Sequence, residues 1–321
     1  MTRERDILDR LRQIATDPAA RELSDDVALL DGLVITHDTI AEGVHFLSTD
    51  PPASVGWKLV AVNLSDLAAK GATPRGALLS LTISDDEKWD ADFLTGVEAA
   101  CESYALPLIG GDTIALPPGS PRVLGLTAIG RAGAHVPHRA GGNAGDQLWL
   151  IGTLGDSAAG LAQLQEDSRA AGPLVDVFRR PIPQLGAGQV LAPRAHAMMD
   201  VSDGLLLDAW RMAEASGCAA VIDLDSIPLS GAFVDVRGDS REARLFAATG
   251  GDDYALLAAL PSEIDPSTLS LPRRTTMARI GSLEAGEPEI RLLSGGRPVE
   301  LPEILGHEHH GLSAAPMADR P

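Results

Sequence analysis

The sequence predicts an α/β protein of two units, and three observations carry this prediction. Apolar segments rich in Val, Ile and Leu alternate with amphipathic segments, which is the pattern of strands and helices in turn. The 321 residues are enough for about two domains of ordinary size. A glycine-rich connector at 139–146 interrupts the alternation, so we place the domain boundary between 1–137 and 138–321.

The first half is predicted to fold as helices packed on a largely antiparallel sheet. The segment 54–70 has apolar residues at helical spacing and is followed by Gly71, a residue typical of helix ends. A second amphipathic helix is predicted at 86–106. Short apolar runs that end in polar residues or glycine predict strands at 31–39, 76–83, 107–112 and 122–132. The run at 107–112 is expected to lead into a turn at Gly110-Gly111.

The second half repeats the alternation and is predicted to be another α/β unit. The segments 155–167 and 203–217 have the pattern of helices, and Gly217 follows the second of them. Strands are predicted at 147–153, 195–200 and 219–225, and a helix or loop followed by a strand at 245–260. At the other end of the chain, residues 1–15 are predicted to form an amphipathic helix.

The chain is strongly acidic, with 26 basic and 45 acidic side chains and a formal net charge of −19. Such a charge argues against nucleic acid or an anionic membrane as a partner. The two cysteines form no CxxC motif, which favours a reducing, cytoplasmic setting. The N-terminus lacks the apolar core of a signal peptide and the apolar runs are too short to cross a bilayer, so we expect a soluble protein.

The common phosphate-binding signatures are missing from the sequence. A Walker loop needs a Gly-Lys pair followed by Ser or Thr, and Lys58, Lys70 and Lys88 all lack that context. Protein-kinase signatures are absent as well. Backbone N–H groups of glycine-rich stretches can approach phosphates, although each stretch alone is more typical of a turn. These stretches are 110–111, 141–145, 152–155 and 250–251.

Aspartates recur where apolar runs end, and this pattern indicates a site for a hard cation. They are Asp25, Asp26, Asp38, Asp66, Asp112, Asp200 and Asp203. Converging strand ends would gather these carboxylates into an all-oxygen site, and Mg²⁺ prefers carboxylates together with phosphate oxygens and water. Taken singly, each aspartate is more typical of a helix cap or a turn. Two features of the whole set favour the cation site. Asp66 lies on an otherwise apolar helical run, where a carboxylate is costly unless it is paired or bound to metal. Asp200 and Asp203 lie three residues apart at a strand–helix junction, where they can converge on one ion.

Four other polar residues each have two interpretations. His45 lies between apolar neighbours, which fits a packed histidine better than a functional one. Arg139 and Arg180 are candidate phosphate clamps, since a guanidinium can bind two phosphate oxygens at once, or else surface residues. His307 begins a His-Glu-His-His tract that fits a solvated run better than a site for a soft metal.

The ordered motifs of the chain resemble those of the thiamine-monophosphate kinase family. They are SDDVALL, THDTIAEGVHF, WKLVAVNLSDLAAKGATP, LIGGDT, RAGGNAGD, GTLGDSAAGL, MMDVSDGLLLD and ATGGDDYALL. The combination of NLSDLAAKGA with GGDT and DVSDG is the most specific part. The wider superfamily includes aminoimidazole ribonucleotide synthetase, selenophosphate synthetase and the hydrogenase-maturation dehydratase. The resemblance implies an N-terminal α/β domain that forms a dimeric β-barrel and a C-terminal α/β sandwich-like domain.

The resemblance also implies a homodimer that phosphorylates thiamine monophosphate to thiamine diphosphate with ATP, without a catalytic side chain. Residues that match the family's Mg²⁺ ligands are Asp26, Thr36, His37, Asp38, Asp66, Asp112, Asp200 and Asp203, with His37 contributing through its backbone. Residues that match its ATP contacts are Gly111, Asp112, Arg139 and Ser202. Residues that match its substrate contacts are His45, Asp252 and His307.

The chain departs from the family pattern at several of these motifs. Ser24 stands where glycine is usual, and Asp252 and Ala255 stand where glutamates are usual. His307 is the nearest match to an aromatic residue that packs on thiamine. Two alternatives stay open, namely a sister ATP-dependent synthetase of the aminoimidazole ribonucleotide or selenophosphate type, and a non-catalytic module that binds Mg²⁺ and nucleotide.

Overall fold

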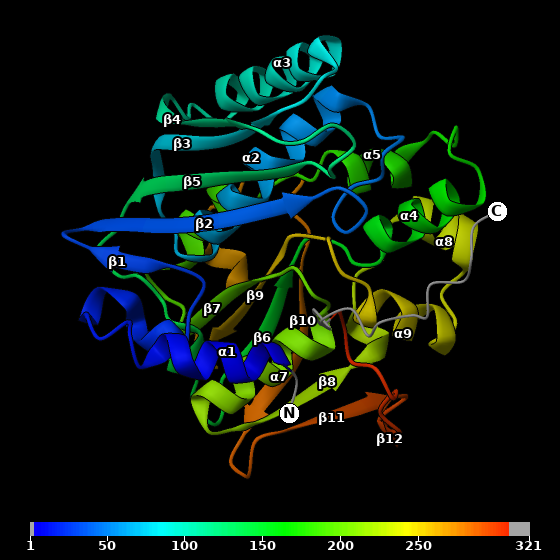
Figure 1. The fold of residues 1–321 in the computed structure, drawn as a ribbon. Helices are drawn as coiled ribbons and strands as arrows, with labels where there is room; N and C mark the ends of the chain where they lie inside the picture. The colour runs from blue at the N-terminus through cyan, green and yellow to red at the C-terminus, as the bar shows by residue number, and fades with distance from the viewer. Residues whose placement is uncertain (1–2, 308–321) are drawn as a thin grey trace.

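The computed structural model describes residues 3–307, so Glu308, His309 and His310 of the predicted solvated run lie outside it (Figure 1). The first sheet has the strand order β1-β2-β5-β3-β4, and only β3 and β4 are parallel. The strands are β1 Ala28–Leu30, β2 Leu33–Ala41, β3 Thr73–Ile83, β4 Leu108–Ala115 and β5 Val123–Arg131. The predicted largely antiparallel sheet is therefore confirmed. Over the described residues of one chain this sheet stays open, with β1 and β4 at its edges, and forms no barrel.

The second sheet lies below the first in Figure 1 and has the order β12-β11-β8-β10-β6-β9-β7. Its neighbours are antiparallel except for β8 and β11. The strands are β6 Gln147–Ile151, β7 Ala197–Val201, β8 Ala219–Asp223, β9 Ala255–Leu260, β10 Met277–Glu284, β11 Glu289–Ser294 and β12 Arg297–Val299. The helices of this half are α4 Asp156–Glu166, α5 Pro173–Arg179, α6 Leu185–Leu191, α7 Leu205–Ser216, α8 Gly231–Arg237 and α9 Arg241–Thr249.

The N-terminal half contributes α1 Arg3–Arg12, α2 Pro52–Ala69 and α3 Glu87–Ser103. Asp86 caps α3 by accepting a hydrogen bond from the Trp89 backbone N–H at 3.0 Å. Helix α2 has a proline in its first turn, where a missing N–H does no harm, and ends before Gly71, whose φ is 60°. No helix of the described residues is long and apolar enough to cross a bilayer.

Strand β4 differs from the prediction, because Gly110 and Gly111 lie inside the strand and not in a turn. A Cβ atom on Gly111 would lie 2.0 Å from the carbonyl oxygen of Leu79 in β3. Glycine is therefore needed for the close approach of the two strands, a role that glycine also has inside sheets.

Helix α2 connects the two sheets. Its residues contact β2 and β5 on the side of the first sheet and β7, β9 and α6 on the side of the second. Close backbone contacts fix it in place, since a Cβ atom on Gly56 would lie 2.2 Å from the Phe93 oxygen in α3. A Cβ atom on Gly188 of α6 would lie 1.9 Å from the Ala68 oxygen. The helix is thus enclosed on all sides.

We expect Gly56→Ala to destabilise the protein by about 1–3 kcal/mol, because the added methyl group has no room between α2 and α3. Gly231→Ala is the matched control, since nothing lies within 4 Å of a Cβ atom at that helical position. Urea unfolding of both variants measures the difference. Wild-type stability of Gly56→Ala would contradict the close packing of these helices.

Candidate active site

Five of the predicted aspartates line one cavity of about 1090 Å³, together with other residues of both halves of the chain. Asp38 comes from β2, Asp66 from α2 and Asp200 from β7, while Asp26 and Asp203 lie in loops beside β1 and α7. Each stands where an apolar element meets the junction of the two sheets. The packing of α2 between the sheets therefore brings distant carboxylates together.

Three of these carboxylates form a compact cluster. Asp26, Asp66 and Asp200 each offer an oxygen atom, and these atoms lie within 4.8 Å of one another. The hydroxyl of Thr36 donates a hydrogen bond to the Asp66 carboxylate and lies 3.3 Å from the Asp26 backbone oxygen. The donor set consists of oxygens alone, as a Mg²⁺ site requires.

Electrostatic repulsion within the cavity is large. Burial, together with the charges of Asp26 and Asp203, raises the pKa of Asp38 to about 6. Burial, then the charges of neighbouring aspartates, raises the pKa values of Asp66 and Asp200 well above their usual range. Carboxylates that repel one another in this way gain most from a divalent cation, so the residues fit the metal that the resemblance implies.

Asp26 is the exception, because two cations lie beside it. Burial alone would raise the pKa of Asp26, but Arg139 and Lys70 outweigh that effect and hold it well below its usual range. Lys70 Nζ lies 3.2 Å from an Asp26 oxygen and 2.6 Å from an Asp25 oxygen, and Arg139 forms an ion pair with Asp26. Asp25 and Asp26 are thus ion-pair partners, and the simple helix-cap interpretation of them is wrong.

Asp208, which sequence analysis missed, holds the loop of Ser202 and Asp203. Its Oδ2 accepts hydrogen bonds from both backbone N–H groups at 3.1 Å. Arg211 Nη1 lies 2.6 Å from the Asp203 carboxylate and 2.8 Å from that of Asp208. Burial raises the pKa of Asp208 to about 7 against the opposing charge of Arg211. The sequence offered one indication of Asp208, because it is the last aspartate of the motif DVSDGLLLD that contains Asp200 and Asp203.

The same cavity also contains the predicted substrate residues. His45 lines it, with Nδ1 accepting a hydrogen bond from the Ala41 N–H at 3.0 Å. Asp252 lies 2.7 Å from Lys58 Nζ, a buried cation that sequence analysis also missed. His307 lines the cavity too, and its backbone N–H donates to the Asp203 oxygen at 2.8 Å.

Other predicted residues lie away from this cavity. Gly111 and Asp112 are in the exposed edge strand β4 and do not line it. The side chain of His37 is exposed, with Nδ1 2.9 Å from Thr127 Oγ1, so only its backbone shares the strand of Thr36 and Asp38. The guanidinium of Arg180 lies 4.3 Å from the centre of the Trp57 ring and does not line the cavity.

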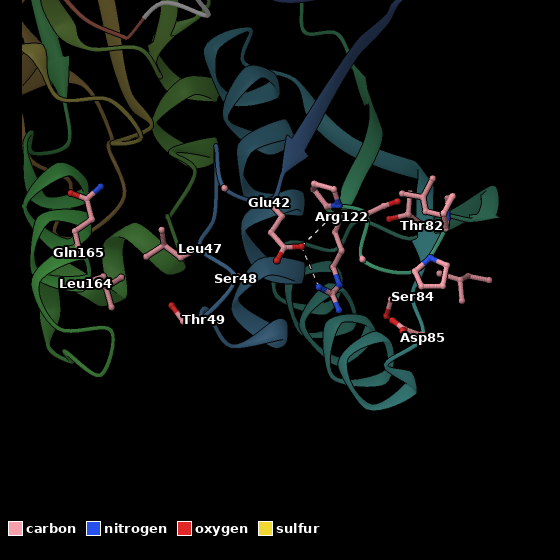
Figure 2. Close-up of a pocket in the computed structure, with 18 residues that line it drawn as sticks. Glu42, Leu47, Ser48, Thr49, Thr82, Ser84, Asp85, Arg122, Leu164 and Gln165 are labelled. Atoms are coloured by element: carbon pink, nitrogen blue, oxygen red, sulfur yellow. Dashed lines mark hydrogen bonds and ion pairs between the residues drawn. The ribbon is translucent and has the colours of Figure 1, made fainter. Parts of the chain in front are cut away.

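A second cavity of about 660 Å³ is lined by Glu42, Leu47, Arg122 and other residues labelled in Figure 2. The ion pair between Glu42 and Arg122 forms part of its wall, with Nη1 3.2 Å from the carboxylate. Arg122 also lies over the Trp89 ring at 4.0 Å. Among the described residues, Glu42 and Asp85 are the carboxylates that line this cavity, and they form no group of three like that of the larger cavity.

Comparisons with known proteins find relatives along most of the chain. The N-terminal domain of AIR synthase related proteins matches residues 24–132, and their C-terminal domain matches residues 143–290. The thiamine-monophosphate kinase of Haemophilus influenzae is 36% identical over 318 residues, covering 93% of this chain and 94% of the relative. The enzyme of that name from Escherichia coli (strain K12) is also 36% identical, covering 94% and 95%. A solved structure of AaThiL complexed with AMPPCP and TMP is 31% identical with a TM-score of 0.80, covering 94% of this chain and 96% of that chain.

The stability of the metal-free protein should depend on pH through Asp38. Its folded-state pKa of about 6 lies above the usual 3.8, so its contribution favours the folded state at low pH and is lost as pH rises through 6. Asp38→Asn should therefore be more stable than wild type near neutral pH, by up to about 3 kcal/mol, and nearly equal to it near pH 4.

Urea unfolding in the presence of a chelator, at both pH values, measures this difference. Asp235→Asn, at an exposed position on α8, is the control that should match wild type throughout. An Asp38→Asn advantage that is equal at both pH values would contradict the electrostatic account.

Proposed function

Because the chain belongs to the thiamine-monophosphate kinase family, we propose that it transfers the γ-phosphoryl group of ATP to thiamine monophosphate and forms thiamine diphosphate. The observation that carries this proposal is the gathering of Asp26, Asp38, Asp66, Asp200 and Asp203 on one cavity. Two anionic phosphates must meet in a chain of net charge −19 that has no Walker lysine. A cavity of carboxylates can hold two phosphates only if cations neutralise their repulsion. The Mg²⁺ ions that accompany ATP would supply this positive charge.

The Mg²⁺ ligands in this proposal are the residues that the resemblance marks and that lie together. They are Asp26, Thr36, Asp38, Asp66, Asp200 and Asp203, with the backbone of His37. When bound, Mg²⁺ neutralises the phosphate oxygens and stabilises the charge of the transferred group. Arg139 and Ser202 contact ATP, while His45, Asp252 and His307 contact the thiamine end of the acceptor.

The transfer itself is a displacement in line. An oxygen of the acceptor phosphate forms a bond to the γ-phosphorus as the bond to the bridging oxygen of ADP breaks, and ADP leaves with that oxygen. The acceptor phosphate is largely ionised near neutral pH, since its second pKa is about 6. A general base is therefore unnecessary, and the chain's residues act by holding the two phosphates in place.

We further propose a homodimer that closes the first sheet into a barrel. Strand β4 is an exposed edge, and large apolar side chains of β3, β4 and β5 are exposed to solvent. They are Leu78 39%, Ile83 44%, Leu108 48%, Ile109 59%, Ile114 53% and Val123 44%. A second copy would cover this surface and pair with the edge. It would also give Gly111 and Asp112 a role in the partner's site, which accounts for their distance from the cavity of their own chain.

The units 1–137 and 138–321 are proposed as the two domains of the chain. The family matches end at residue 132 and resume at residue 143, which supports a boundary in this region. The enzyme is proposed to work in the cytoplasm, in line with its free cysteines, Cys101 and Cys218.

A coupled assay for thiamine diphosphate tests the proposed function. We expect product from thiamine monophosphate and ATP with Mg²⁺, and none with a chelator. Aminoimidazole and selenide acceptors, run in parallel, separate the sister synthetases. Binding of Mg–ATP without turnover of any acceptor would contradict the proposal and indicate a binding module.

Asp66→Asn and Asp203→Asn should each lower turnover at least about 100-fold, because each removes a proposed ligand charge. Asp235→Asn, exposed on α8, is the matched control and should retain wild-type turnover. Steady-state kinetics with saturating Mg²⁺ measure the loss. Near-normal turnover of either site variant would overturn the metal-site assignment.

Ile114→Lys should convert the dimer into a monomer, because it places a charge on the proposed subunit interface. Val236→Lys, which adds the same charge at an exposed position on α8, should stay dimeric. Light scattering coupled to size-exclusion chromatography measures the mass. A monomeric wild-type enzyme with full activity would contradict both the dimer and the role of Asp112.

A further inference from the structure

The buried ammonium group of Lys58 joins two loops that form one wall of the larger cavity. Lys58 lies in α2, and its side chain is 2% exposed. Its Nζ donates hydrogen bonds to the His45 backbone oxygen at 2.9 Å and to Asp252 Oδ2 at 2.7 Å. It also lies 4.0 Å from the centre of the Phe178 ring. An ammonium has three N–H donors, and these two oxygens and one aromatic ring give it three partners within the protein.

Asp252 is held through both of its carboxylate oxygens. Lys58 contacts Oδ2, and the Tyr254 hydroxyl donates to Oδ1 at 2.8 Å. The backbone at Asp252 and Tyr254 has φ values of 67° and 52°, a region that residues with side chains rarely adopt. Such a conformation persists only where its surroundings fix it. Asp253 supplies a further anchor, because its carboxylate accepts a hydrogen bond from the Gly155 N–H at 2.8 Å.

Along α2, Lys58 lies apart from Asp66, one of the carboxylates that would hold the phosphates. Asp66 follows it by eight residues in α2, which is about 12 Å along the helix axis. The cavity wall near Lys58 includes the apolar side chains of Leu161 and Phe178, which suit an aromatic ring. The Lys58 end therefore differs in chemistry from the phosphate end.

We propose that Lys58 is a positioning residue for recognition of the thiamine group. It fixes the loop of His45 against the loop of Asp252, so that both side chains face the organic end of the acceptor in one arrangement. The charge of the buried Lys58 ammonium is balanced by Asp252. In this proposal Lys58 itself does not contact the acceptor. This inference rests on the proposed function, because it concerns the acceptor that the function names.

Lys58→Met tests the inference by removing the ammonium while keeping most of the side-chain length. We expect the KM for thiamine monophosphate to rise at least about tenfold, with the KM for ATP within about twofold of wild type. Lys88→Met is the matched control, because Lys88 is 81% exposed and pairs only with Asp92 among its hydrogen bonds in the described structure. It should leave both KM values unchanged. An equal rise of the two KM values in Lys58→Met would show a general structural role and overturn the inference.

Tyr254→Phe provides a second variant if Lys58→Met fails to fold. It removes one hydrogen bond to Asp252 with little change of shape, and should raise the KM for thiamine monophosphate alone, by roughly three- to tenfold. An unchanged KM for thiamine monophosphate would count against the inference. Wild-type enzyme that makes no thiamine diphosphate would instead refute the proposed function, so the two failures are distinct.

A spectroscopic measurement on the wild-type enzyme needs no turnover. The chain has three lysines, so nitrogen-15 labelling of lysine side chains gives a simple spectrum, and the Lys58 signal is the one lost in Lys58→Met. We expect this signal to shift with thiamine monophosphate and to stay in place with inorganic phosphate. A signal that saturating thiamine monophosphate leaves unmoved would overturn the inference.

Discussion

The burial of helix α2 is the constraint on which the rest of the structure depends. The helix is apolar on nearly every side, and such a helix is stable in water only when it is covered all round. The two sheets provide that cover from opposite sides. The polar residues that α2 carries, Lys58, Asn63 and Asp66, therefore lie in the interior at the junction of the sheets. The position of the cavity follows from this enclosure.

The carboxylates of the cavity are electrostatically unequal. Asp26 has cationic neighbours in Lys70 and Arg139, and its negative charge is balanced within the protein. Asp38, Asp66 and Asp200 have mainly burial and like charges around them, and these raise their pKa values. The charge of Asp26 is therefore neutralised by the protein itself. The charges of Asp38, Asp66 and Asp200 are neutralised only when a cation or a proton binds. This division links the acidic composition of the chain to its dependence on metal.

Sequence patterns predicted the long elements well, because apolar spacing over many residues directly reflects the burial of one face. The segments 54–70 and 203–217 are examples. Shorter elements such as α5 and β12 escaped prediction, since so few residues hold too little periodicity. At Gly110-Gly111 the usual link between glycine and turns was misleading, because the contact that requires glycine is made with another strand.

The site was predictable as a set of aspartates but not as a set of contacts. The motifs NLSDLAAKGA and DVSDG contain Asp66 and Asp200. The contact between α2 and β7 brings these two side chains together. Lys58 gave no signal, because its partner Asp252 lies 194 residues away and nothing in the local sequence indicates the pairing. The placement of Asp112 on an edge strand was equally hidden, since a sequence does not say which strands of a sheet are its edges.

The scarcity of lysine has a practical consequence. Lys58 and Lys70 are both enclosed within the protein, and Lys88 is the remaining lysine, on the outer surface of α3. Amine-reactive dyes, cross-linkers and solid supports will therefore attach to the folded protein at Lys88, apart from any reaction at the terminal amine. Attachment there leaves the ion pairs of the cavity untouched, so the fold itself directs site-selective coupling without engineered cysteines.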